Sequence, residues 1–395
     1  MKTYRLRAVA KGKNVMLKED DSRQINNKIK NRNSSFEILR IISMILIITH
    51  HYSIHGGFDA ITYDNLSINQ FFLQILLFGG KIDCYLFMFI TGYFMICRRM
   101  NYKKVFILFL ELEFYSLVIF LIFNLGMGRH YSKKDWIRNI FPIIYGNWFV
   151  VNYIMLYFLL PFINKLVLHL SKKELKIMIL SIIIIYSIIP SICYYITQYQ
   201  WSFSNFDFMI VSYIIGAYIR INGFSKFDKK RTCVKTILFS FSILIFWVIF
   251  MDSLAYILKN NSYIWMATVT RAPTSFLLLM IAIATFYIFK NNSFNSKIIN
   301  FIAPSMLGVY LIHDNDLIKP WIWKELFPNN NYLYSNYLVV HFGVKVFAVF
   351  IISLVIDLLR RYIIEKPCKQ LIDLMYVIIK LGVKRIWVCL DRFFS

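Results

Sequence analysis

Long apolar stretches separated by short charged segments dominate this chain. Ten of them are long enough to cross the roughly 30 Å hydrocarbon core of a bilayer as helices. They cover residues 36–54, 71–97, 103–125, 148–165, 174–195, 207–221, 234–251, 264–289, 299–318 and 337–359. Apolar runs of this length favour membrane helices over buried strands. The pattern therefore predicts an all-α fold, a polytopic integral membrane bundle of about ten transmembrane helices.

The distribution of charge orients this bundle. An even number of spans places both termini on one side, and most of the 45 Lys and Arg residues fall in segments on that side. Because basic loops stay in the cytoplasm, we expect both termini to be cytoplasmic. The segment 126–147 is the exception, since it carries four basic residues on the outer side, where they would attract an anionic substrate.

Composition supports a membrane location. Hydrophobic residues make up 58% of the chain and charged residues 17%, which is too little charge for a soluble surface. The formal net charge of +24 sits in short loops, and this favours contact with anionic lipid over nucleic acid. The six cysteines show no metal-ligand spacing, so we expect no metal site.

The two ends of the chain differ from the membrane part. Residues 1–35 are basic and poor in apolar residues, which predicts a disordered cytoplasmic tail. Residues 36–367 would form the membrane domain. Residues 368–395 mix apolar and basic positions and predict a cytoplasmic amphipathic helix at the membrane surface.

The first span carries an unusual line of polar residues. Arg40 and His51 are eleven residues apart, which at about 100° per residue places them on one helix face. The rise of 1.5 Å per residue separates them by roughly 16 Å along the axis. Glu37 lies three residues before Arg40 and can pair with it. Such residues are costly in lipid unless they face protein or a wet cavity.

Two interpretations of this line stay open. In the first, Glu37 and Arg40 reach the inner interface and His51 only ends the helix. In the second, His51 is a catalytic base, because an imidazole with a pKa near 6.5 can take a proton from a hydroxyl. The second also accounts for the shared face. His50 is roughly 80° away from that face and is expected to serve packing.

Five motifs in order carry a resemblance to a known family. They are ExLRxxxxxxxxxxH at 37–51, FMFITGY at 87–93, NWFVVNYIMLYFLLPFIN at 147–164, SMLGVYLIH at 305–313 and EKP at 365–367. Together they resemble the integral-membrane acyltransferase-3 family, which includes bacterial O-acetyltransferases of cell-surface polysaccharides. The resemblance covers about Glu37 to Pro367.

The resemblance implies a membrane O-acyltransferase in the bacterial plasma membrane. An acetyl group would pass from cytoplasmic acetyl-CoA to a hydroxyl of an extracytoplasmic glycan. His51 would act as base or carry the acetyl group, and Arg40, held by Glu37, would contact the cofactor. Four basic residues would attract the CoA phosphates, namely Arg98, Arg99, Lys103 and Lys104.

Other candidates have equally good structural explanations. His313 could act as a second base or bind the sugar, or it could be a helix-end histidine satisfied by Asp314 or water. Trp148 and Tyr153 could stack on a sugar, with Asp314 also binding it, but an aromatic belt at the interface explains the rings equally well.

The third predicted span departs from the family pattern. Acidic Glu111 and Glu113 stand where a base associated with the cofactor is frequent. Carboxylates inside a span are rarely idle, and Arg271 is a candidate partner chosen on charge alone.

Two other functions were weighed. A transporter or flippase of lipid-linked glycans would be expected to show internal repeats, which the sequence lacks. A glycan polymerase would need a large outer loop. Neither would depend on acetyl-CoA.

Overall fold

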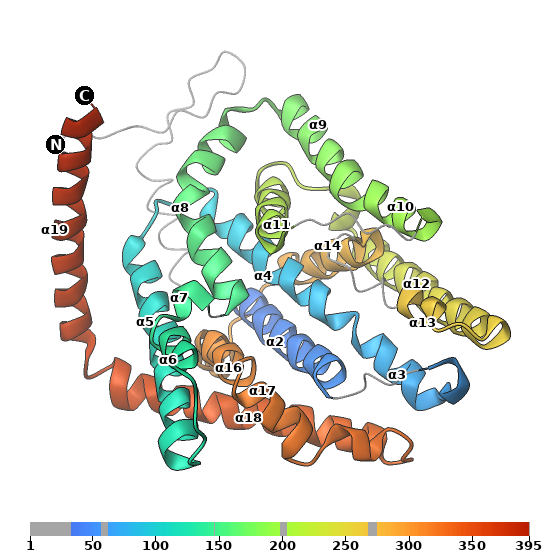
Figure 1. Ribbon diagram of the computed structural model, residues 1–395. Helices are drawn as coiled ribbons and strands as arrows, with labels where there is room; N and C mark the ends of the chain where they lie inside the picture. The colour runs from blue at the N-terminus through green and yellow to red at the C-terminus, as the bar shows by residue number, and fades with distance from the viewer. Residues whose placement is uncertain (1–32, 57–61, 146, 198–203, 268–274, 395) are drawn as a thin grey trace.

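The computed structural model describes residues 33–56, 62–145, 147–197, 204–267 and 275–394. Within these ranges every regular element is a helix (Figure 1). The α-helices are α2 (Ser34–Ile54), α3 (Ile68–Leu76), α4 (Gly79–Met95), α5 (Tyr102–Leu121), α6 (Lys133–Ile140), α7 (Pro142–Tyr145), α8 (Trp148–His169), α9 (Lys172–Ile183), α10 (Ile189–Thr197), α11 (Asn205–Ile221), α12 (Lys230–Leu258), α13 (Ser262–Ala267), α14 (Phe276–Lys290), α15 (Lys297–Ile302), α16 (Met306–His313), α17 (Ile318–Pro320), α18 (Leu338–Arg360) and α19 (Lys369–Phe394). The predicted all-α membrane class is confirmed.

The number of spans is confirmed only in part. Among the described residues, seven helical segments are long and apolar enough to cross a membrane. They correspond to all the predicted spans except the sixth, eighth and ninth. There the helices are shorter: α11 has 17 residues, α14 has 15, and Lys297–His313 is a short apolar segment. The total of ten and the cytoplasmic termini stay predictions.

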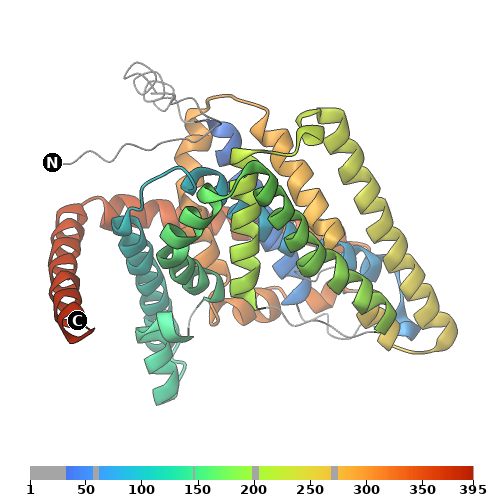
Figure 2. The ribbon, with the colours of Figure 1, turned by 90° about the horizontal axis from the view of Figure 1, so that it is seen from above.

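The two ends of the chain have different outcomes. Residues 1–32, which hold most of the predicted tail, lie outside the described residues. At the other end the chain forms a helix, α19, from Lys369 to Phe394, and its cytoplasmic location at the membrane surface stays a prediction. It lies at one edge of the molecule beside α5, opposite α12, in both views (Figures 1 and 2).

Helix α2 lies at the centre of the bundle. It packs against α3, α4, α14, α16 and α18. Its first turn is fixed by Asn33, whose side chain accepts a hydrogen bond from the Ser35 N–H, and by the Ser35 hydroxyl, which donates to the Phe289 carbonyl at 2.6 Å. A central position in the bundle lets a polar stripe on α2 face protein instead of lipid.

Glycines allow the helices around α2 to approach closely. A Cβ on Gly92 would lie 2.1 Å from the Tyr213 carbonyl oxygen, and one on Gly216 would lie 2.6 Å from that of Phe89. Helices α4 and α11 therefore meet backbone to backbone, as small residues permit in membrane bundles. A Cβ on Gly80 would overlap the ring of His50, which lies between α2 and α4.

Candidate active site

A cavity of about 600 Å³ runs along α2, between that helix and α4, α8 and α16. Arg40 and His51 both line it, and so do Glu37 at one end and His55 at the other. The prediction that Arg40 and His51 share a face is therefore confirmed, because both side chains border one space. We call this space the central cavity.

The end of the central cavity near the start of α2 carries an ion pair. The Arg40 Nη1 donates to the Glu37 Oε1 at 2.6 Å, as the spacing predicted. Glu37 is 5% exposed. A carboxylate in the first turn also lies near the positive end of the helix dipole. Glu37 thus holds the guanidinium of Arg40 at the cavity wall.

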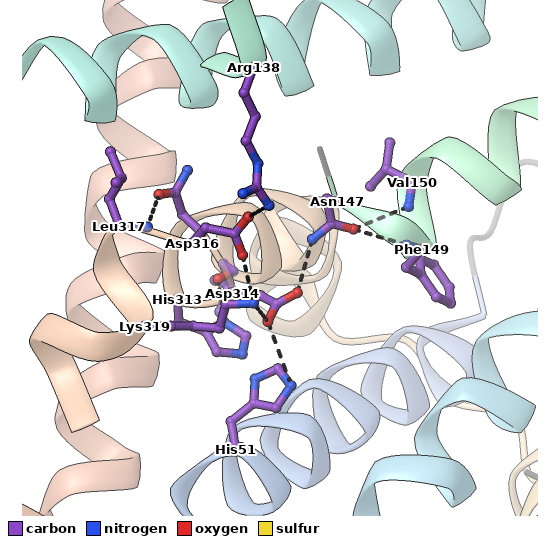
Figure 3. Close-up of polar contacts among 12 residues, drawn as sticks. His51, Arg138, Asn147, Phe149, Val150, His313, Asp314, Asp316, Leu317 and Lys319 are labelled. Atoms are coloured by element: carbon purple, nitrogen blue, oxygen red, sulfur yellow. Dashed lines mark hydrogen bonds and ion pairs between the residues drawn. The ribbon is translucent and has the colours of Figure 1, made fainter. Parts of the chain in front are cut away.

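The other end of the cavity gathers His51, Asp314 and Lys319 (Figure 3). The His51 Nε2 lies 3.7 Å from the Asp314 Oδ1. The Lys319 Nζ lies 3.3 Å from the same oxygen and 3.0 Å from the Asp316 Oδ1. The His51 Nδ1 is buried and has no hydrogen-bond partner among the described residues. One ring nitrogen of His51 therefore faces a carboxylate, and the other is uncommitted.

Asn147 fixes the Asp314 carboxylate. Its Nδ2 donates to the Asp314 Oδ2 at 3.0 Å, while its Oδ1 accepts from the N–H groups of Phe149 and Val150 at 3.2 Å. The same amide thus caps α8 and orients the partner of His51. Sequence reasoning missed this role, although an Asn directly before a helical run is a recognisable N-cap signal.

Charge at this end of the cavity is balanced. Burial acts against protonation, but the carboxylates of Asp314 and Asp316 together raise the pKa of Lys319 above its usual value. Burial, and then the Lys319 ammonium, lower the pKa of His55, while Asp314 acts in the opposite direction. Ligand atoms of His51, His55 and Asp314 lie within 4.8 Å of one another, which is compatible with a metal ion. Asp314 already has a cationic partner without a metal ion, namely the ammonium group of Lys319.

A cavity that spans much of a central membrane helix, with a histidine beside a carboxylate at one end, suits a group-transfer enzyme. The acyltransferase domain family matches residues 33–358. The chain belongs to the acyltransferase-3 family. It is a membrane acyltransferase. The curated proteins and the solved structures gave no match.

The other two histidines near His51 occupy different positions in this acyltransferase. His313 is fully buried, and its ring centre lies 5.1 Å from that of His51. Its Nδ1 is hydrogen-bonded to the Val309 carbonyl at 2.6 Å, and His313 does not line the central cavity. His50 does line the cavity, but its Nδ1 bonds the Leu77 carbonyl at 3.0 Å.

The predicted sugar-binding residues all lie at the cavity. Trp148 and Tyr153 line it, and so does Asp314. Two further residues were not singled out from the sequence. Asp83 lines the wall with one buried oxygen lacking a partner among the described residues. The Lys81 Nζ lies 5.6 Å from the centre of the Trp148 ring.

Of the residues predicted to bind CoA, Arg40 lines the central cavity, whereas the four predicted to attract the phosphates lie outside it. Arg98, Arg99 and Lys104 are exposed, whereas Lys103 pairs with Asp373 at 2.6 Å. Lys103 lines a separate pocket of about 570 Å³ beside α18 and α19, the α18–α19 pocket. Its other basic side chains are Arg361, Lys366 and Lys369. Pro304 lines both spaces, so the α18–α19 pocket adjoins the Arg40 end of the central cavity.

Glu111 has a partner that the sequence did not suggest. The Arg360 Nη2 donates to its Oε1 at 3.0 Å, the Arg360 Nη1 donates to Glu365 at 3.0 Å, and the Nε donates to Asp357 at 2.9 Å. Arg271, the partner chosen on charge, lies outside the described residues. Glu365 of the EKP motif is 39% exposed and therefore forms the outer member of an otherwise buried ionic group that joins α5 to α18.

Proposed function

We propose that this acyltransferase moves an acetyl group from cytoplasmic acetyl-CoA to a hydroxyl of an extracytoplasmic glycan at the bacterial plasma membrane. The observation that supports it is one cavity lined by Arg40 at one end and His51 at the other. About 16 Å of helix separates these residues, roughly half the thickness of the hydrocarbon core. A thioester arm that enters at Arg40 can therefore present its acetyl group near His51.

His51 serves as the general base in this proposal. Asp314 beside Nε2 favours the tautomer with the proton on that nitrogen, which leaves a lone pair on Nδ1. The Nδ1 takes the proton of the acceptor hydroxyl as its oxygen attacks the thioester carbonyl. The C–S bond then breaks, and the imidazolium returns the proton to the CoA thiolate. Transfer through an acetyl-histidine is the other route that these groups support.

The donor enters from the Arg40 side. The α18–α19 pocket gathers Lys103, Arg361, Lys366 and Lys369 next to that end of the cavity. Guanidinium and ammonium groups bind phosphate through charge-assisted hydrogen bonds. We assign the nucleotide end of CoA to this pocket, with Arg98, Arg99 and Lys104 adding positive charge around its entrance.

A transfer assay in membranes tests the proposal. Membranes that contain the protein are given acetyl-CoA labelled in the acetyl group, and label is counted in the surface polysaccharide. We expect incorporation that depends on the protein. A flippase of lipid-linked glycans would change the amount of glycan outside without taking up label, and that result would overturn the proposal.

A further inference from the structure

A second, smaller pocket lies behind the partner of His51. Its volume is about 240 Å³, and it is enclosed by α5, α6 and the segments around Asn147 and Asp314. We call it the α5–α6 pocket. It shares Trp148, Asp314 and Lys319 with the central cavity, so these three side chains form a partition between the two spaces. Its opening is marked by Arg138 and Asp316, whose side chains are 45% and 48% exposed.

The lining of this pocket is mostly polar. The pocket is lined by the hydroxyl of Ser116, which donates to the Asn139 carbonyl at 3.0 Å and can still accept a hydrogen bond, by the side-chain amides of Asn139 and Asn315, and by the rings of Tyr115 and Trp148. Planar hydrogen-bonding groups beside an indole suit a sugar ring, which has an apolar face and hydroxyls around its edge. The volume is below the roughly 300–1,000 Å³ of pockets that hold drug-sized ligands, so it suits a single small ring.

The charges in the α5–α6 pocket cancel. Arg138 donates to Asp316, and Lys319 contacts both Asp314 and Asp316 (Figure 3). Two cations thus meet two carboxylates inside one small space. No cation among the described lining residues is left unpaired for an anionic ligand, which would also meet two fixed negative charges.

We propose that the α5–α6 pocket binds the uncharged sugar residue next to the one that is acetylated. This rests on the function proposed above. The reacting sugar occupies the mouth of the central cavity at His51. The neighbouring sugar lies on the other side of the partition that Trp148, Asp314 and Lys319 form. The acceptor is then a glycan of two or more residues, not a free monosaccharide.

The pocket also changes the interpretation of the basic segment 126–147. From the sequence, its four cations suggested an anionic substrate. In the structure, Arg129 pairs with Glu325 and Arg138 pairs with Asp316. Two of the four cations in this segment therefore pair with carboxylates of the segment that carries Asp314. In this proposal the pocket recognises its sugar through hydrogen bonds.

Arg138→Ala tests the proposal because Arg138 lies at the opening of the pocket. Its matched control is Arg129→Ala, which removes a similar exposed pair between the same two segments but lies outside the pocket. The acceptors are fragments of one, two and more residues, released by partial hydrolysis from the unacetylated surface polysaccharide of cells lacking the protein. Acetate release from acetyl-CoA without acceptor is measured in parallel as a readout of donor chemistry.

We expect the wild-type kcat/KM to be at least tenfold larger for fragments of two residues than for one. Arg138→Ala should raise KM for the longer fragments about tenfold, a larger change than in kcat or in acceptor-independent acetate release. Arg129→Ala should behave as the wild type. Mass spectrometry of the best fragment should show a neighbouring sugar without carboxylate or phosphate.

Three results would overturn the inference. These are equal kcat/KM for one and two residues, a charged neighbouring sugar, or an Arg138→Ala KM that matches that of Arg129→Ala. If the wild type acetylates neither fragments nor polysaccharide, the proposed function itself fails, which is a different outcome.

Discussion

Two groups of charged residues lie among the apolar helices, and they differ in what surrounds them. The Asp314 group consists of His51, Asn147, Asp314, Asp316 and Lys319, and it lies between the central cavity and the α5–α6 pocket. The Arg360 group consists of Glu111, Tyr115, Asp357, Arg360 and Glu365. Tyr115 borders the α5–α6 pocket and Glu365 the α18–α19 pocket, but the central pair, Asp357 and Arg360, lines none of the three pockets described above.

The two groups use their hydrogen bonds differently. Arg360 commits all three of its nitrogens inside its group, and Asp357 is fully buried. In the Asp314 group, the His51 Nδ1 has no partner among the described residues and His51 borders a cavity. Burying charge is costly in both places. Asp357 also keeps one buried oxygen, Oδ2, without a partner among the described residues, but Asp357 lines none of the three pockets. A group whose central ion pair lies away from the pockets serves to join helices, whereas a group that keeps a free atom beside a cavity is suited to chemistry.

The largest expected effect comes from His51→Ala. Loss of the general base should lower acetyl transfer by about 10²–10⁴-fold. The measurement is labelled acetyl transfer in membranes, normalised to the amount of inserted protein. His169→Ala is the matched control, since that side chain is exposed near the end of α8 and is hydrogen-bonded to the Lys165 carbonyl. Transfer that persists in His51→Ala would remove His51 from the mechanism.

Arg360→Leu should instead damage stability. It leaves the carboxylates of Glu111 and Asp357 buried without their cation, at a cost of about 3–5 kcal/mol. Thermal unfolding of the detergent-solubilised protein measures this, and activity should fall only as the folded fraction falls. A stable Arg360→Leu protein with no activity would show that the Arg360 group takes part in catalysis, and the contrast between the two groups would fail.

Asp314→Asn should lower the rate while leaving stability nearly unchanged. Asparagine keeps the shape of the side chain but loses the charge that favours the Nε2–H tautomer of His51. A misdirected base costs about 10²-fold in rate. The check is kcat for acetyl transfer beside the unfolding temperature. A drop in unfolding temperature as large as that of Arg360→Leu would mean that Asp314 is a structural residue.

Glu111→Gln should have the smallest effect. The amide oxygen still accepts a hydrogen bond from Arg360, and Asp357 and Glu365 remain as its ionic partners. The change in unfolding free energy should be about 1 kcal/mol or less. Denaturant or thermal unfolding in detergent measures it, with Glu113→Gln as the control in the same helix. A change as large as that of Arg360→Leu would show that Glu111 dominates the group.

The sequence was sufficient to predict features that depend on residues within a few helical turns of one another. The helical period placed Arg40 and His51 on one face, and the three-residue spacing predicted the Glu37–Arg40 pair. Prediction was weaker where span length was marginal. Helices α11 and α14 are shorter than the other spans, and apolar composition alone does not set where a helix ends.

The partners of these residues could not be predicted. Arg360 is 249 residues from Glu111, and Asn147 is 167 residues from Asp314. No periodicity relates positions so far apart, so charge alone led to Arg271 as a candidate for the third span. The carboxylates that pair with Arg129 and Arg138 of the basic loop 126–147 were unpredictable for the same reason, because they come from the segment after α16.

By itself, the sequence determined a helical membrane protein, a polar stripe on the first span and a family resemblance. Each depends on composition or on neighbours within a few turns. Only the tertiary structure decided that the stripe faces a cavity, that Asp314 lies beside His51 and that Arg360 pairs with three carboxylates. The physical reason is that burial and pairing depend on which helices meet, and several distant segments must pack before any of these contacts exists.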